Sequence, residues 1–302
     1  ILRINNYMLS IHPSTIQLLR LKFSFFLMPV FWFALSCISN IHWGKAILIG
    51  VILHVIIYPS SNGYNSYMDR DTDSVGGIKN PLQPTKQLFY VSIVLDVLAI
   101  VLSLFISEAF VALILLYIVC SRLYSYRKVR IKQYAILGYL TVIINQGAVV
   151  FLAVYWGAST NVVTEIPWLL LVVASCLIGG FYPITQVYQH KQDKADNVKT
   201  ISMLLGIKGT FIFCALAYTL AFALLYFYYS SNNQLVYFFV LQVLFLPIIF
   251  YFIKWFLKVL KDDREANFEN TMFMNVWASS FTNLAFIILL LISFSFYLSY
   301  SL

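Results

Sequence analysis

The chain has 302 residues, of which 61% are hydrophobic and only 11% are charged. Soluble domains carry about 25% charged residues, so this composition excludes a soluble globular domain and indicates a polytopic membrane protein. The net charge of +8 comes from 20 Lys and Arg against 12 Asp and Glu. In so apolar a chain we interpret basic residues as topology signals and predict no nucleic-acid binding. The 4 cysteines are isolated, which argues against a disulfide framework or a zinc site.

Apolar stretches predict nine transmembrane helices and an all-α fold. A helix needs about 20 largely apolar residues to cross the bilayer core. The polar breaks between such stretches place the spans near residues 16–39, 44–66, 88–106, 109–125, 136–157, 166–188, 208–229, 234–257 and 272–299. We treat residues 1–302 as a single domain. Residues 1–15 are too polar for a signal-peptide core, so we expect the first span to direct insertion.

The basic residues predict the orientation of these spans. An odd number of spans places the two termini on opposite sides, and every Lys and Arg except Lys45 then falls on the N-terminal side. By the positive-inside rule this side is cytoplasmic and the C-terminus lies outside. We expect a bacterial inner membrane. The cytoplasmic loops are the longer and more polar ones, so we expect a functional site to open on that side.

The second span ends in a polar, acidic stretch. At helical spacing Asn65, Asp69 and Asp73 fall at positions i, i+4 and i+8 of one face, and Asn62 lies one turn earlier. Asp71 is expected to point elsewhere. Carboxylates brought together in a partly dehydrated site are unfavourable unless a cation compensates their charge. The motif therefore predicts a site for a hard divalent cation.

The sixth span ends in the same way, which indicates an internal repeat. Shifting residues 58–73 by 124 positions places them on residues 182–197, and Asp69 then meets Asp193 while Asn65 meets Gln189. Four spans separate the two motifs, so both reach the cytoplasmic side. Interrupted apolar segments at matching places in two repeats indicate a binding site between them. We therefore expect the two acidic helix ends to face one cavity.

Facing carboxylates hold a polyanion through Mg²⁺, because Mg²⁺ combines a few carboxylates with substrate phosphate oxygens. A membrane cavity with acids at its mouth suits a prenyl diphosphate, and aromatic side chains can stabilise an allylic cation after the diphosphate leaves. Basic and phenolic side chains near the motifs are candidates for contacting the diphosphate. These candidates are Lys79, Tyr124, Arg127, Arg130, Lys132 and Lys199.

These motifs resemble those of the UbiA superfamily of intramembrane prenyltransferases. The run Asn65-x3-Asp69-x3-Asp73 resembles its first acidic signature, and Tyr182-Pro183 through Asp193, followed by Lys199-Thr200 and Leu205-Gly206, resembles the second. The run from Tyr124 to Arg130 resembles the family's cap between the fourth and fifth helices. The resemblance implies nine helices around a central cavity that opens to the cytoplasm, with Mg²⁺ and a prenyl diphosphate held between the motifs.

The resemblance also implies which residues form the site. Asp69, Asp73 and Asp193 are the expected catalytic carboxylates, and Asn65 joins them as an expected metal ligand. The chain departs from the family pattern at Gln189, where an Asp is usual. Either Gln189 is a neutral ligand that mirrors Asn65, or Asp196 supplies the missing carboxylate from the next turn. The repeat favours Gln189.

The sequence is compatible with three functions. The first is transfer of a prenyl group to an aromatic or quinone-precursor acceptor, which Asn145 and Gln146 in the fifth span favour slightly because they could orient the acceptor's hydroxyl or carboxylate group. The second is terpene cyclisation of the prenyl diphosphate without an acceptor. The third is transport, suggested by Asp96 inside the third span, since intramembrane ionisable groups often mark ion pathways. The outer halves of the spans are almost wholly apolar, which disfavours transport.

Overall fold

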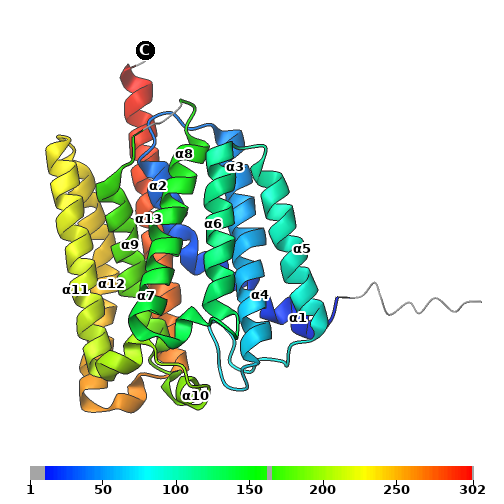
Figure 1. Cartoon of the computed structure of the whole chain (residues 1–302). Helices are drawn as coiled ribbons and strands as arrows, with labels where there is room; N and C mark the ends of the chain where they lie inside the picture. Colours follow the sequence, from blue (N-terminus) through cyan, green and yellow to red (C-terminus); the bar gives the residue numbers. More distant parts are fainter. Residues whose placement is uncertain (1–10, 162–164, 301–302) are drawn as a thin grey trace, which may run out of the picture.

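The computed structural model describes residues 11–161 and 165–300, with side chains up to residue 293, and in that part of the chain it is all-helical (Figure 1). Arg3, which was assigned to the cytoplasmic side, lies outside the described residues. The first span consists of α1 (Pro13–Leu18), η2 (Leu21–Leu27) and α2 (Met28–Ser36), and the second of α3 (Trp43–Val51), η3 (Ile52–Ile57) and α4 (Tyr58–Asp69). The remaining elements are α5 (Lys86–Ser103), α6 (Glu108–Ser125), η4 (Ile131–Gln133), α7 (Ala135–Ile143), η5 (Ile144–Val149), α8 (Val150–Ala158), α9 (Trp168–Phe181), η6 (Pro183–Gln186), α10 (His190–Ala195), α11 (Ile201–Ser231), α12 (Leu235–Lys261), η7 (Asp263–Glu265) and α13 (Phe268–Tyr300).

The prediction of nine spans is confirmed. Within the described residues, nine helical segments are long and apolar enough to cross a membrane. Their bounds are 13–36, 43–69, 86–103, 108–125, 135–158, 168–186, 201–231, 235–261 and 268–293. The largest difference is at the seventh span, which begins at Ile201 because the helix continues across a kink at Gly206, where φ is +70°. Glycine adopts this left-handed conformation without a steric penalty.

Besides the seventh span, several others are not regular α-helices throughout. The first is broken at Arg20, whose φ of +50° separates α1 from the 3₁₀-helix η2. The second and fifth spans contain π-helical turns, η3 and η5. Such turns are rare and occur frequently at functional sites. The π-turn η5 contains the two intramembrane amides, Asn145 and Gln146, that the sequence singled out.

Glycines let the sixth span approach its neighbours closely. A Cβ atom on Gly147 of η5 would lie 2.6 Å from the Cα of Ser175 in α9. A Cβ on Gly180 of α9 would lie 2.6 Å from the ring of Tyr218 in α11. Small residues at such crossings replace side-chain volume with backbone contact, as is common between membrane helices. This packing places the end of α9 beside the fifth span, where it borders the cavity described below.

Asp96 has a structural partner. Its side chain is buried in α5, forms an ion pair with Arg122 of α6 and accepts a hydrogen bond of 2.6 Å from the Oγ of Ser60 in α4. The Arg122 guanidinium also lies 4.2 Å from the centroid of the Tyr64 ring. Asp96 therefore ties three helices together and does not line the cavity. The observation that suggested transport is explained by packing.

The polar segments gather at one end of the bundle. Helices α1 and α10 and the connections after α4 and α6 lie at the end opposite the last turns of α13 (Figure 1). Both acidic motifs lie at this end, as the even spacing of the repeat predicts.

Candidate active site

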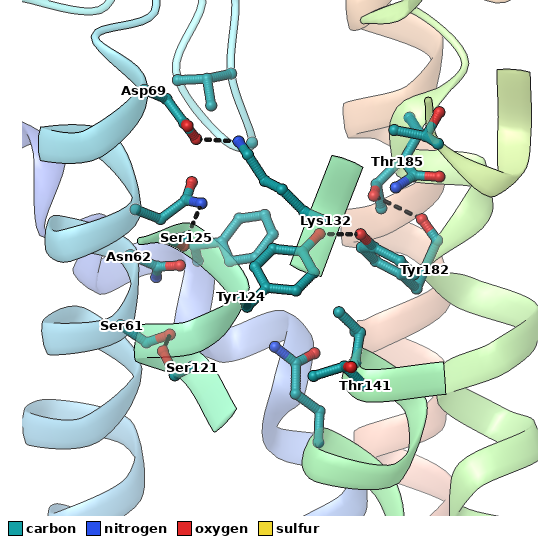
Figure 2. Close-up of a pocket in the computed structure, with 18 of the residues that line it drawn as sticks. Ser61, Asn62, Asp69, Ser121, Tyr124, Ser125, Lys132, Thr141, Tyr182 and Thr185 are labelled. Carbon is teal, nitrogen blue, oxygen red and sulfur yellow. Dashed lines mark hydrogen bonds and ion pairs between the residues drawn. The ribbon is translucent and has the colours of Figure 1, made fainter. Parts of the chain in front are cut away.

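A cavity of about 190 Å³ opens at the polar end of the bundle. Its walls come from η2, α4, α6, the fifth span, α9 and η6, and its mouth is bordered by the segment after α4 and by α10 (Figure 2). Residues of both acidic motifs line it. The prediction that the two motifs face one cavity is therefore confirmed.

Asp69 is an enclosed carboxylate at this mouth. Its side chain is 3% exposed and forms an ion pair with the Nζ of Lys132, which Figure 2 shows reaching across the mouth. Its other oxygen lies 3.4 Å from Arg130 Nη2. Basic residues of the connection between α6 and α7 thus neutralise the first acid.

The helical face predicted for the first motif ends at Asp69. Helix α4 stops there, and Arg70 adopts a left-handed conformation with φ of +55°. The turn carries Asp71 into the cavity wall, where its carboxylate accepts a hydrogen bond of 2.5 Å from Gln192. Asp73 is exposed and does not line the cavity. The prediction that Asp71 points elsewhere is wrong, and the i+8 position on one helical face does not exist for Asp73.

The second motif places Gln189 and Asp193 on the cavity wall. They lie one turn apart, with the Asp193 backbone N–H donating to the Gln189 carbonyl over 2.9 Å. The Oδ2 atom of Asp193 is buried and has no hydrogen-bond partner among the described residues. Burial, reinforced by Asp71 and Asp69 and opposed by Lys132, raises the pKa of Asp193 to about 7. Burial and the neighbouring Asp69 raise the pKa of Asp71 to about 6.

Asp196 has a different environment. Its carboxylate pairs with Arg130 and, over 2.8 Å, with Arg127, and it does not line the cavity. Partial burial raises its pKa, but hydrogen bonds from Arg130 and Arg127 outweigh this effect and lower the pKa of Asp196 below its usual value. Gln189 and Asp196 were the two alternatives for the missing ligand of the second motif, and of these only Gln189 lines the cavity.

Arg127 and Arg130 hold the mouth together from outside the cavity lining. Arg127 donates to the carbonyl oxygens of Met68 and Asp69 over 2.6 Å and 3.0 Å, so it caps the last turn of α4 while also pairing with Asp196. Unpaired carbonyls at a helix end favour such cationic donors. These arginines therefore link the two acidic motifs.

The other residues predicted to contact the metal or the diphosphate divide into those that line the cavity and those that do not. Tyr124 lines the cavity, and its hydroxyl lies 2.5 Å from that of Tyr182 (Figure 2). Asn65 also lines it and donates to Ser125 Oγ over 2.9 Å. Lys79 instead forms an exposed ion pair of 2.5 Å with Glu269, and Lys199 is exposed, so neither is part of the cavity lining.

Arg20 is a cavity residue that the sequence analysis treated only as a topology anchor. It donates to Ser66 Oγ over 2.6 Å, and its Nε atom is buried with no hydrogen-bond partner in the described part of the chain. A signal was present, because Arg20 falls inside the predicted first span, and an ionisable residue within a span is a candidate functional residue. What the sequence could not show is the break at Arg20 that turns its side chain into the cavity.

Unusual backbone conformations cluster around this mouth. Five described residues other than glycine have positive φ, and four of them border the acidic motifs. These are Arg20, Arg70, Arg130 and Asn197, with φ of 50°, 55°, 45° and 54°. Such conformations cost roughly 1–3 kcal/mol each and persist only where the surroundings enforce them. The geometry of the mouth is thus maintained at the expense of local backbone strain.

The donor set suits a cation that arrives with an anionic ligand. Among the described side chains, no group of three or more His, Cys, Asp and Glu forms a ready-made metal site. Mg²⁺ differs from zinc in this respect, because it commonly binds one or two carboxylates and completes its shell with water and substrate phosphate. The unpartnered Asp193 oxygen, the raised pKa values of Asp71 and Asp193, and the neutral oxygens of Asn65 and Gln189 fit such an ion.

Comparison with known proteins identifies the fold. A UbiA homologue from Archaeoglobus fulgidus, solved with DMAPP and Mg²⁺, has a TM-score of 0.70 at 17% identity, covering 92% of this chain and 99% of the homologue. A UbiA homologue from Aeropyrum pernix K1 has a TM-score of 0.68 at 20% identity, covering 89% of this chain and 98% of that one. The structure of a digeranylgeranylglyceryl phosphate synthase has a TM-score of 0.59 at 20% identity, covering 92% and 97% of the two chains.

These solved structures establish the shared architecture. Among curated proteins, no sequence matches this chain. The model of the UbiA prenyltransferase family matches residues 26–277, which include every span except the beginning of the first and the end of the last. With nine apolar helices in its described part, the protein is an integral membrane protein, and it belongs to the UbiA prenyltransferase family.

Proposed function

We propose that this protein transfers a prenyl group from a prenyl diphosphate to an aromatic or quinone-precursor acceptor, with Mg²⁺ as cofactor. The observation that carries the proposal is the pair of acidic motifs that meet at the mouth of one intramembrane cavity, with Asp69 and Asp71 from the first motif and Asp193 from the second. The homologue from Archaeoglobus fulgidus, which binds DMAPP and Mg²⁺ or GPP and Mg²⁺, supports this assignment.

The residues at the mouth would bind the ion and the diphosphate. Asn65, Asp69, Asp71, Gln189 and Asp193 offer oxygen atoms to the ion, and Asp71 takes the place predicted for Asp73. Bound Mg²⁺ would neutralise the diphosphate oxygens and so favour departure of the diphosphate.

Three further groups face the diphosphate from the mouth. Arg20 and Lys132 are the cations of the cavity wall and would contact its oxygens, while Tyr124 offers a hydroxyl. In the reaction, the bond between the prenyl C1 and the diphosphate oxygen breaks with its electron pair on the oxygen. A ring carbon of the acceptor forms the new bond to C1 and loses a proton to the departing diphosphate.

An apolar wall of the cavity suits the prenyl chain. Phe23 and Leu27 from η2 lie on the lining together with Ile178 and Phe181 from α9. The faces of the aromatic rings can stabilise the allylic cation by cation–π attraction, and the aliphatic side chains can bury the chain.

Both motifs contribute to this one cavity, which supports the prediction that the chain forms a single domain. The distribution of Lys and Arg supports a mouth that faces the cytoplasm. We further propose that the membrane is a bacterial inner membrane.

Cyclisation is the second candidate, because it needs the same metal and the same apolar wall. Transfer is favoured by the amides Asn62, Asn145 and Gln146 on the cavity wall, since a hydrocarbon product offers them no hydrogen bonds. Product analysis separates the two functions. Purified protein with Mg²⁺ and labelled geranyl or farnesyl diphosphate should prenylate a phenolic acceptor and release diphosphate. A labelled hydrocarbon that forms equally well without any acceptor would select cyclisation and contradict transfer.

A further inference from the structure

The inner half of the cavity is polar but carries no charge. The charged residues of the cavity wall all lie at its mouth, and they are Arg20, Asp69, Asp71, Lys132 and Asp193. Deeper in, the polar lining consists of amides and hydroxyls. They include Ser61 and Asn62 of α4, Tyr117 and Ser121 of α6, and Asn145 and Gln146 of η5.

These neutral groups lie deeper in the bundle than the carboxylates. At 1.5 Å of rise per residue, Asn62 lies about 10 Å from Asp69 along α4, and Asn145 lies about 15 Å from the start of the fifth span at Ala135. Figure 2 shows Ser61 and Asn62 below Asp69 on α4, Ser121 beside Ser61, and Thr141 across the cavity. A prenyl diphosphate anchored at the mouth would leave room below its head group for a second molecule that meets these groups.

The amide of Asn145 is fixed in orientation by a backbone partner. Its Nδ2 donates to the Tyr117 carbonyl over 3.2 Å, and only the NH₂ end of an amide can make this bond. Its Oδ1 is therefore the atom left over, and this atom is buried without a hydrogen-bond partner within the described chain. Asn145 is 6% exposed and lines the cavity. The wall thus presents a buried hydrogen-bond acceptor that lacks a donor.

A second buried atom on the wall is a donor. Asn62 Nδ2 has no hydrogen-bond partner among the described residues, whereas the neighbouring Ser61 hydroxyl is paired with Ser121 over 2.6 Å. Buried polar atoms are rarely left unpaired, and each exception needs an explanation. A ligand that can both donate and accept would satisfy both atoms.

The chemistry of these atoms selects between acceptor classes. A carboxylate or phosphate would meet the lone pairs of Asn145 Oδ1. Arg122 lies at a similar depth, but it is paired with Asp96 and does not line the cavity, so no described cation of the wall offsets the burial of such an anion. An unpaired buried anion is strongly disfavoured. A hydroxyl group donates to one oxygen and accepts from an N–H, so it matches both unpaired atoms. We infer that the acceptor is an uncharged hydroxyl-bearing ring, a phenol or hydroquinone without a carboxylate, whose hydroxyl donates to Asn145. This inference rests on the proposed prenyl transfer.

A pair of acceptors that differ by one carboxylate group tests the inference in the unmodified protein. Hydroquinone and 2,5-dihydroxybenzoate share one ring and two hydroxyls, and only the second carries a carboxylate. With Mg²⁺ and labelled geranyl diphosphate, we expect kcat/KM for hydroquinone to exceed that for the benzoate by at least about tenfold. Equal use of the two rings, preference for the benzoate, or use of neither by protein that binds geranyl diphosphate would overturn the inference.

A variant locates the effect at Asn145. Loss of one neutral hydrogen bond corresponds to a change of roughly 3- to 10-fold, so Asn145→Leu should raise the KM for hydroquinone by that factor. Asn283→Leu is the matched control, because Asn283 is a buried amide of α13 outside the cavity lining, and it should leave this KM unchanged. An unchanged KM in Asn145→Leu would overturn the inference.

Binding of geranyl diphosphate in the presence of Mg²⁺, measured separately, distinguishes the two claims. If the wild-type protein does not bind geranyl diphosphate, the proposed function itself is refuted. If it is retained, the acceptor comparison judges the inference alone.

Discussion

Replacing Asp193 by Asn should make the protein more stable while removing its response to Mg²⁺. Asp193 is half-buried at the cavity mouth, its buried Oδ2 atom has no partner among the described residues, and its pKa is raised to about 7. A carboxyl whose pKa is raised on folding destabilises the folded state at every pH above its unfolded value. The effect grows until the pH reaches the folded value and disappears as the pH falls to 3.8.

The size of the effect follows from this shift. A tenfold change in an acid constant corresponds to about 1.4 kcal/mol, so a rise from 3.8 to about 7 amounts to about 4 kcal/mol at pH 8. At pH 5 the same pKa values leave about 2 kcal/mol. Asn has the shape of Asp without the charge. We therefore expect Asp193→Asn to raise the melting temperature in EDTA by several degrees at pH 8, and by less at pH 5.

Thermal unfolding in detergent, with and without Mg²⁺ and geranyl diphosphate, is the assay. A ligand at 100 times its dissociation constant stabilises by about 2.7 kcal/mol, so the wild-type protein should gain stability from the ligands and Asp193→Asn should not. The control is Asp196→Asn, which should have the opposite effect on stability because Arg127 and Arg130 stabilise the charged form of Asp196. This variant should melt below the wild-type temperature. The reasoning is refuted if Asp193→Asn melts at or below the wild-type temperature at pH 8 in EDTA.

Three further predictions concern the metal and the packing. Gln189→Ala should raise the Mg²⁺ concentration for half-maximal rate while Asp196→Ala changes it little, since only Gln189 lines the cavity; a titration with the reverse result would contradict the assignment. In the wild-type protein this concentration should rise as the pH falls from 8 to 6, because protons compete with the metal for Asp193, whose pKa is about 7; a flat profile would contradict this. Gly147→Ala should destabilise the protein by roughly 1–3 kcal/mol, because its Cβ would lie 2.6 Å from the α9 backbone. Gly44→Ala is the control, with its nearest neighbour at 3.4 Å, and equal melting temperatures for the two variants would argue against the close helix crossing.

The number and order of the spans could be predicted because they depend on a local property. Each stretch of about 20 apolar residues must cross the bilayer as a helix, whatever surrounds it. The 124-residue repeat was also visible in the sequence, and it correctly brought Asp69 and Asp193 to one cavity.

The details of the mouth could not be predicted because they depend on contacts between distant segments. Helix α4 ends at Asp69 through the left-handed turn at Arg70 and the cap from Arg127, which lies 58 positions further along the chain. This turn exchanges the expected places of Asp71 and Asp73. The sequence pattern of this segment is also compatible with an uninterrupted helix, so it gives no indication of the turn.

The most direct test of the central claim is the binding of geranyl diphosphate to purified protein, measured by titration calorimetry with Mg²⁺ and with excess EDTA. The account predicts saturable binding that requires Mg²⁺ in the wild-type protein and is lost in Asp193→Asn, whose melting curve shows that it is folded. Binding of equal affinity in EDTA, or unchanged Mg²⁺-dependent binding by Asp193→Asn, would contradict a site in which the two acidic motifs hold a prenyl diphosphate through Mg²⁺.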